Sequence, residues 1–137
     1  MDKILVIGAL GQLGTELCME LRKRFGVDNV VISDLKKPEG ALATGPFEIL
    51  NAMDRDGLFK IAERHEITQV YHLAAVLSAK GESDPKFAWQ LNMDSLINVL
   101  DLAKEKNLDK VYWPSSIAVF GPSTPGINPP HRTVMGP

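Results

Sequence analysis

The feature of this chain that most constrains its fold is a glycine turn near the N-terminus, in which Gly8, Gly11 and Gly14 are separated by two residues each. An apolar run, 4–7, precedes the turn, and a helical pattern follows it. Asp34 stands twenty positions after the last glycine, where a second apolar run ends. A strand, a glycine turn, a helix and a second strand with a terminal carboxylate form the arrangement with which βαβ units bind dinucleotides.

Each part of this arrangement suits one part of a dinucleotide. Glycines let the backbone turn sharply and approach a diphosphate closely, while the start of the helix offers unpaired N–H groups and the positive end of its dipole. The carboxylate of Asp34 accepts hydrogen bonds from a ribose diol. The sequence therefore predicts a dinucleotide site, and the alternative is a glycine turn that binds nothing.

Length, composition and charge favour one soluble globular domain. The chain has 137 residues, of which 45% are hydrophobic and 23% charged, and its formal net charge is −2. We expect no nucleic acid partner, because there is no basic stripe, and no membrane partner, because no apolar run reaches spanning length. Cys18, the only cysteine, cannot form an internal disulfide and is expected in the core. The lack of an internal disulfide favours the cytoplasm, as does a first strand that starts too early to leave room for a signal peptide.

Apolar runs and helical periodicities alternate along the chain. We predict strands over residues 3–8, 29–33, 47–50, 69–73 and 110–113. We predict helices over residues 12–25, 54–65 and 84–106, the last with Asp84 as N-cap and Pro85 at its first position, and loops over 36–45 and 76–83. The fold class is therefore α/β, a Rossmann-like doubly wound parallel sheet with strand order 3-2-1-4-5 and its ligand at the carboxyl ends of the strands. Residues 1–121 are expected to form this dinucleotide-binding domain, incomplete, and residues 122–137 an irregular tail rich in proline and glycine.

Polar residues also follow the fourth and fifth predicted strands. His72 and the small residues through Ala75 end the fourth strand, where small side chains either let a dinucleotide lie close or serve tight helix–sheet packing. His72 is expected to be a structural, hydrogen-bonding histidine. Ser115 and Ser116 follow the fifth strand and suit binding of a substrate oxygen, or form a simple turn. Asn92, inside the third helix, is expected to bind backbone groups, and the histidines are not spaced like metal ligands, so no metal site is expected.

With these residues in view, the chain resembles the extended short-chain dehydrogenase/reductases, the superfamily of nucleotide-sugar epimerases and dehydratases. Three segments are similar in detail to its NAD-dependent L-threonine 3-dehydrogenases, namely residues 8–14, 77–82 and 114–122. The Ser-Ala-Lys-Gly-Glu loop, 78–82, best separates these dehydrogenases from sugar epimerases, which share the glycine turn but usually differ at this loop.

The resemblance implies a set of site residues. The residues expected to bind NAD are Gly8, Gly11, Gln12, Leu13, Gly14, Asp34, Leu35, Asn51, Leu73, Ala74, Ala75, Asn92 and Ser115. Ser116 corresponds to the catalytic hydroxyl that binds the reacting oxygen, and Ser78 to a residue that touches the amino-acid substrate. In such enzymes a tyrosinate removes the substrate's hydroxyl proton while hydride passes to the nicotinamide, and a lysine four residues later lowers the pKa of that tyrosine.

The sequence departs from the family in two respects. Asn51 stands where the family commonly has an Asp near the adenine ring, a neutral change because an amide can still bond the adenine amino group. The larger departure concerns the catalytic pair. The sequence has no Tyr-x-x-x-Lys pair after Ser116, and its only tyrosines, Tyr71 and Tyr112, fall in predicted strands. Residues 133–137 fit the segment just before the family's tyrosine, although another register would place Met135 at the tyrosine position. We therefore expect a fragment without a general base and with negligible dehydrogenase activity.

The same resemblance and the charge pattern indicate cofactor and partners. Asp34 would repel a 2′-phosphate, which favours NAD over NADP, although Lys36 and Lys37 close by could reverse that preference. The expected substrate is a small molecule, an amino acid such as L-threonine. The third helix carries apolar side chains around much of its girth, and such helices pair across a dimer interface in the family, so we expect a homodimer or self-association.

Two alternatives remain beside a dehydrogenase part. One is a fragment of a nucleotide-sugar epimerase or dehydratase, against which the 78–82 loop speaks. The other is a non-catalytic dinucleotide-binding module, which the missing Tyr-x-x-x-Lys pair favours.

Overall fold

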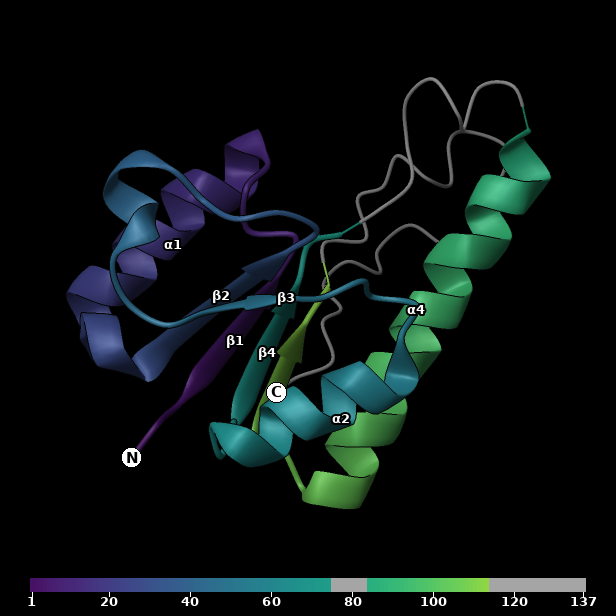
Figure 1. The fold of residues 1–137 in the computed structure, drawn as a ribbon. Helices are drawn as coiled ribbons and strands as arrows, with labels where there is room; N and C mark the ends of the chain where they lie inside the picture. Colours follow the sequence, from purple (N-terminus) through teal and green to yellow (C-terminus); the bar gives the residue numbers. More distant parts are fainter. Residues whose placement is uncertain (75–83, 114–137) are drawn as a thin grey trace.

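Five parallel strands form one sheet in the order β3-β2-β1-β4-β5 (Figure 1). The structure, a computed structural model, describes residues 1–74 and 84–113. The strands are β1 (Ile4–Ile7), β2 (Val30–Asp34), β3 (Phe47–Ile49), β4 (Gln69–His72) and β5 (Lys110–Tyr112). Both the predicted fold class and the predicted strand order are confirmed, while the predicted tail over 122–137 lies outside the described residues.

Helices cover both faces of the sheet. Helix α1 (Gln12–Phe25) packs on one face, and helices α2 (Arg55–Arg64) and α4 (Pro85–Lys106) pack on the other (Figure 1). Two short 3₁₀ helices, η1 (Val27–Asn29) and η2 (Gly40–Ala43), flank β2. This places the sheet as the middle of three layers, which is the doubly wound arrangement.

The side chains on the two faces of β1 belong to separate hydrophobic clusters. Ile4 and Val6 pack with α1, whereas Leu5 and Ile7 pack with α2 and α4. All four side chains are buried because successive residues of a strand point to opposite faces and both faces are covered. Cys18 of α1 is fully buried, as predicted, and burial raises the pKa of its thiol to about 11, so the thiol stays uncharged.

Side chains and backbone turns end the helices as the sequence indicates. The carboxylates of Asp54 and Asp84 accept hydrogen bonds from backbone N–H groups in the first turns of α2 and α4. Pro85 stands at the first position of α4, where the missing N–H costs nothing. Asn107, with a φ of 53°, ends α4 in the left-handed conformation.

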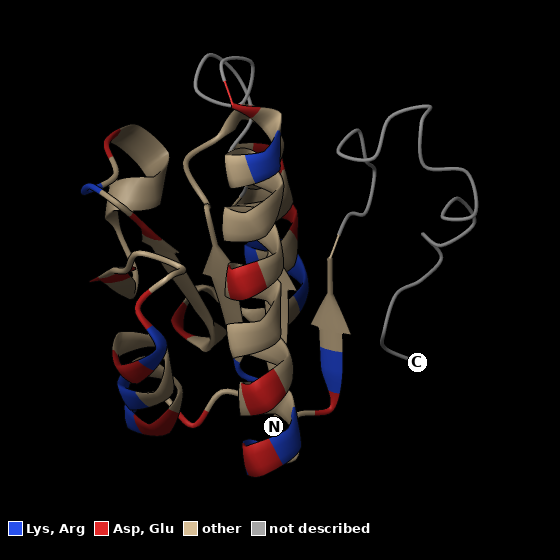
Figure 2. Ribbon diagram, turned by 90° about the vertical axis from the view of Figure 1, so that its right-hand side faces the viewer, with Lys and Arg blue, Asp and Glu red and all other residues tan. Residues whose placement is uncertain are grey.

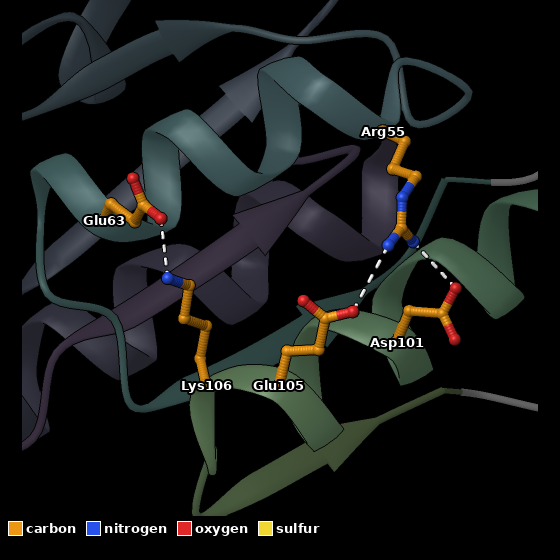
Figure 3. A network of polar contacts seen from close by, with 5 residues as sticks. All are labelled: Arg55, Glu63, Asp101, Glu105 and Lys106. Carbon is orange, nitrogen blue, oxygen red and sulfur yellow. Dashed lines mark hydrogen bonds and ion pairs between the residues drawn. The ribbon is translucent and has the colours of Figure 1, made fainter.

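Charged side chains link α2 to α4 on the outside of the molecule (Figure 3). Arg55 Nη1 lies 2.7 Å from Asp101 Oδ2, and its Nη2 lies 3.4 Å from Glu105 Oε2. Lys106 Nζ lies 2.6 Å from Glu63 Oε2 at the other end of α2. These pairs hold α2 along α4 and so help to fix the segment that precedes α2.

The predicted polar loop over 36–45 is partly wrong, because it contains η2 and a core residue. Leu42 is 4% exposed and packs with the α1 cluster. The buried guanidinium of Arg22, in α1, donates hydrogen bonds to the carbonyl oxygens of Ala41, Leu42 and Thr44. One long side chain thus pins the segment to α1, a contact that local polarity does not reveal.

Within residues 1–74 and 84–113, none of the helices has the length and apolar character needed to cross a membrane.

Candidate functional site

A cavity of about 310 Å³ opens at the carboxyl ends of the strands. Most of the residues predicted to bind the cofactor line it, namely Gly8, Gly11, Asp34, Leu35, Asn51, Leu73, Ala74 and Asn92. The lining also includes six residues that the sequence did not indicate, namely Ile7, Leu50, Ala52, Met53, Leu91 and Ser95. The cavity lies where an open α/β sheet binds its ligand.

The backbone at Gly8 has no room for any other residue. Its φ is +81°, and a Cβ built there would lie 2.6 Å from the backbone nitrogen of Ala74. The N–H groups of Gly8 and Ala9 both donate to the carbonyl oxygen of Ser33, at 3.0 Å each. The turn is therefore held against β2 and β4, and the missing side chain lets three backbone segments meet.

The start of α1 is open toward the cavity. Gly11 is the N-cap and makes no side-chain cap, and a Cβ built on it would meet nothing within 4 Å. The first N–H groups of a helix need acceptors from outside the helix. An anion such as a diphosphate can supply them while it gains from the helix dipole. By contrast, a Cβ on Gly14 would lie 2.6 Å from the Ala9 carbonyl oxygen, so this glycine serves close packing.

Asp34 joins the glycine turn to the end of β2. Its Oδ2 accepts a hydrogen bond from the N–H of Leu10 at 2.8 Å, and its Oδ1 accepts one from the N–H of Leu35 at 2.7 Å. A carboxylate has about four acceptor positions, so both oxygens keep capacity for the hydroxyl groups of a ribose. The carboxylate is thus oriented before any ligand arrives.

On the α4 side, a buried histidine supports the wall of the cavity. His72 is 1% exposed, and its Nε2 lies 2.9 Å from Ser95 Oγ. The Ser95 hydroxyl donates its one hydrogen to the carbonyl oxygen of Asn92, so it accepts from Nε2–H. Burial lowers the pKa of His72 to about 4, so the imidazole is neutral at pH 7. His72 thus makes the hydrogen bond expected of a structural histidine, and its Nδ1 finds no hydrogen-bond partner among the described residues.

The segment between β3 and α2 forms a second wall of the cavity. Asn51 Oδ1 accepts a hydrogen bond from the N–H of Met53 at 2.9 Å. Asn98 of α4 donates through Nδ2 to the carbonyl oxygen of Ala52 at 3.1 Å. These residues follow directly on a strand of the sheet, so the rule that ligands bind at carboxyl ends could have identified them.

The structure leaves some predicted site residues apart from the cavity. Gln12, Leu13 and Gly14 belong to the first turn of α1 and do not line it, and Leu13 is 61% exposed. Ala75, Ser78, Ser115 and Ser116 lie outside the described residues. The structure thus brings eight of the predicted cofactor-binding residues together around one cavity, and the binding, catalytic and substrate roles of all the predicted site residues stay predictions.

The described residues show neither a block of like charges along α4 nor a cluster of metal ligands. Acidic and basic residues are interspersed along α4 and do not form a block of one sign (Figure 2). In the part of the chain that the structure describes, no three His, Cys, Asp or Glu side chains gather as metal ligands would. The cavity instead combines backbone N–H groups, one carboxylate and apolar walls, a combination that suits a dinucleotide.

Comparison with known sequences agrees with this geometry. The profile of the NAD dependent epimerase/dehydratase family matches residues 4–136. An epimerase/dehydratase of Staphylococcus saprophyticus is 46% identical over 139 aligned positions, which cover all of this chain and 43% of the relative. The chain thus spans less than half the length of that relative.

Solved structures share the fold. A partial consensus L-threonine 3-dehydrogenase superposes with a TM-score of 0.80 at 57% identity, over 90% of this chain and 40% of that one. The holo form of a GalE-like L-threonine dehydrogenase from Cupriavidus necator gives the same TM-score and coverage at 55% identity. A UDP-glucose 4-epimerase from Thermus thermophilus, in complex with NAD, gives 0.69 at 23% identity, over 81% of this chain and 36% of that one. The family profile matches nearly the whole chain, which confirms the predicted superfamily. The chain therefore belongs to the NAD dependent epimerase/dehydratase family.

Proposed function

We propose that this chain is the NAD-binding part of an oxidoreductase that resembles L-threonine 3-dehydrogenase. The observation that carries the proposal is the turn at Gly8, where only a residue without a Cβ fits and where Asp34 already holds the N–H of Leu10. The 57% and 55% identity to L-threonine dehydrogenase structures supports this branch of the family.

The residues present fit NAD, because the cavity offers a separate contact for each of its parts. The turn and the open N-terminus of α1 would bind the diphosphate, and Asp34 the adenosine ribose. Leu73 and Ala74, at the end of β4, would lie along the nicotinamide half, with Ala75, Asn92 and Ser115 beside it. When bound, NAD accepts a hydride from the CH–OH carbon of a substrate.

Substrate binding is assigned to the segments that follow β4 and β5. Ser116 would hold the reacting oxygen and Ser78 would contact the amino acid, which we propose to be L-threonine. No Tyr-x-x-x-Lys pair is present to remove the hydroxyl proton. Tyr71 and Tyr112 instead stack on each other with ring centroids 4.5 Å apart, and burial, with Tyr112 next to it, raises the pKa of Tyr71. We therefore expect these 137 residues to bind NAD in the cytoplasm without turning over substrate.

Titration calorimetry tests the cofactor assignment. We expect the chain to bind NAD more tightly than NADP, because the Asp34 carboxylate would repel a 2′-phosphate. Tighter binding of NADP would show that attraction of the 2′-phosphate by Lys36 and Lys37 outweighs its repulsion by Asp34. Absence of heat with millimolar NAD, from chain shown to be folded by circular dichroism, would overturn the proposal.

A second candidate is the corresponding part of a nucleotide-sugar epimerase or dehydratase. A relative that aligns with all of this chain is described as an epimerase/dehydratase, which favours this alternative. Thermal-shift measurements in saturating NAD separate the two candidates. Stabilisation by L-threonine would support the dehydrogenase, and stabilisation by a UDP-sugar the epimerase.

A further inference from the structure

The wall between β3 and α2 is held rigidly at the cavity. The N–H of Asp54 donates to the carbonyl oxygen of Asn51 at 2.8 Å, which closes a turn. From the opposite side, Asn98 Nδ2 reaches the carbonyl oxygen of Ala52. The wall is therefore tied both to its own turn and to α4, so a side chain that projects from it has a defined place.

The orientation of the Asn51 amide follows from its partner. Met53 N–H is a donor, so the amide atom 2.9 Å from it must be the acceptor Oδ1. The Nδ2 group, with two N–H donors, is then what the exposed side chain offers to the cavity. Asn51 thus acts on a ligand as a hydrogen-bond donor.

The base of a bound dinucleotide would lie against this wall. Asp34 and the wall are adjacent, because the N–H of Leu50 donates to the Asp34 carbonyl oxygen at 2.9 Å. A base attached to a ribose held by Asp34 extends along the cavity toward Asn51. Leu35, 65% exposed, and Met53, 37% exposed, supply apolar surface for a flat ring.

We propose that Asn51 reads the purine through its amide donors, so that this site accepts a 6-oxopurine dinucleotide about as well as NAD. Adenine offers ring nitrogens as acceptors, and its amino group is a donor. Hypoxanthine has a carbonyl oxygen, an acceptor, where adenine has its amino group, and it also keeps ring nitrogens that accept hydrogen bonds. A donor therefore finds an acceptor on either base. This inference rests on the proposed NAD site and adds which bases that site tolerates.

The test compares the dissociation constants of NAD and nicotinamide hypoxanthine dinucleotide by calorimetry. We expect the wild-type constants to differ by less than about fivefold, because neither base leaves the amide donors unpaired. The variant N51D retains Oδ1 and the turn but replaces the donor by an acceptor. It should shift the ratio toward NAD by about fivefold or more, since its carboxylate fits the adenine amino group and repels the hypoxanthine oxygen.

A second variant separates base reading from the shape of the wall. N98A removes the bond to Ala52, so it should weaken both dinucleotides equally and leave their ratio unchanged. A larger wild-type preference for NAD, an unchanged ratio in N51D, or a changed ratio in N98A would overturn the inference while NAD binding stands. If the folded wild-type chain binds neither dinucleotide, the proposed function falls and the inference with it.

Discussion

Gly8 and Gly11 stand three residues apart in the same turn, yet a methyl group at each would meet a different environment. At Gly8 it would enter the backbone of Ala74, and the positive φ strains any side chain. At Gly11, whose φ is −72°, it would meet open space at the mouth of the cavity. One glycine is thus required for folding of the turn, and the other for access to it.

Substitution by alanine separates these two requirements. G8A should lower the free energy of unfolding by about 2 kcal/mol or more, because of strain and the clash, and should abolish NAD binding. G11A should change stability by less than about 1 kcal/mol and still weaken NAD binding, since its methyl group occupies ligand space. Chemical denaturation and calorimetry measure both effects. Equal destabilisation by the two variants would contradict this reading of the turn.

The buried imidazole of His72 makes stability depend on pH. Its pKa is lowered from 6.5 to about 4 by burial, so between these values the unfolded chain binds a proton that the folded chain does not. The contribution is fully present above pH 6.5 and is lost as pH falls to about 4, a loss of about 3 kcal/mol. H72Q can still donate to Ser95 but does not titrate. Its denaturation curves should show a correspondingly smaller loss over this window, and parallel pH profiles for both proteins would refute the assignment.

At the scale of elements, the ion pairs between α2 and α4 test how much exposed charged contacts add to the stability of two packed helices. The Arg55 side chain is 43% exposed and its partners Asp101 and Glu105 are 46% and 57% exposed, so solvent screens them. R55M should cost only about 0.5–1 kcal/mol, and the cost should shrink in 1 M NaCl. K106M, which removes the single pair with Glu63, should cost less. A salt-independent loss from R55M would point instead to its contact with the Phe59 ring, 4.6 Å away.

Elements with a strong local signal could be predicted from the sequence, and contacts between distant segments could not. The continuous apolar run before Gly8 indicates a strand buried on both faces, and the structure has it as β1. Burial of Leu42 depends on Arg22, which lies twenty residues earlier and bonds to backbone carbonyls. Any residue type supplies such a carbonyl, so no pattern marks it. Ser95 of α4 could not be predicted for a similar reason, because its place at the cavity depends on a contact with His72 in β4, 23 residues earlier in the chain.

At the scale of the whole molecule, α4 presents apolar side chains outward as well as inward. Val99 and Leu102 are fully buried against the sheet. Apolar side chains on the other side of the helix remain exposed, with exposed fractions of 46% for Trp89, 49% for Ile97 and 38% for Leu100. Their spacing of eight and three residues aligns them on one side of the helix. Figure 2 shows this helix in front of the sheet, on the outer surface of the molecule. A stripe of this kind favours contact with another apolar surface.

We expect this stripe to pair two copies of the chain, as proposed for the family's long helices. Light scattering coupled to gel filtration should give a mass that rises toward a dimer with concentration. L100K should remain monomeric and keep its melting temperature, because the side chain is not part of the core. V27K offers a matched control, since Val27 is 42% exposed but lies in η1, away from α4. A monomeric wild type at the highest concentration, or equal effects of the two lysines, would show that apolar exposure on α4 does not drive association.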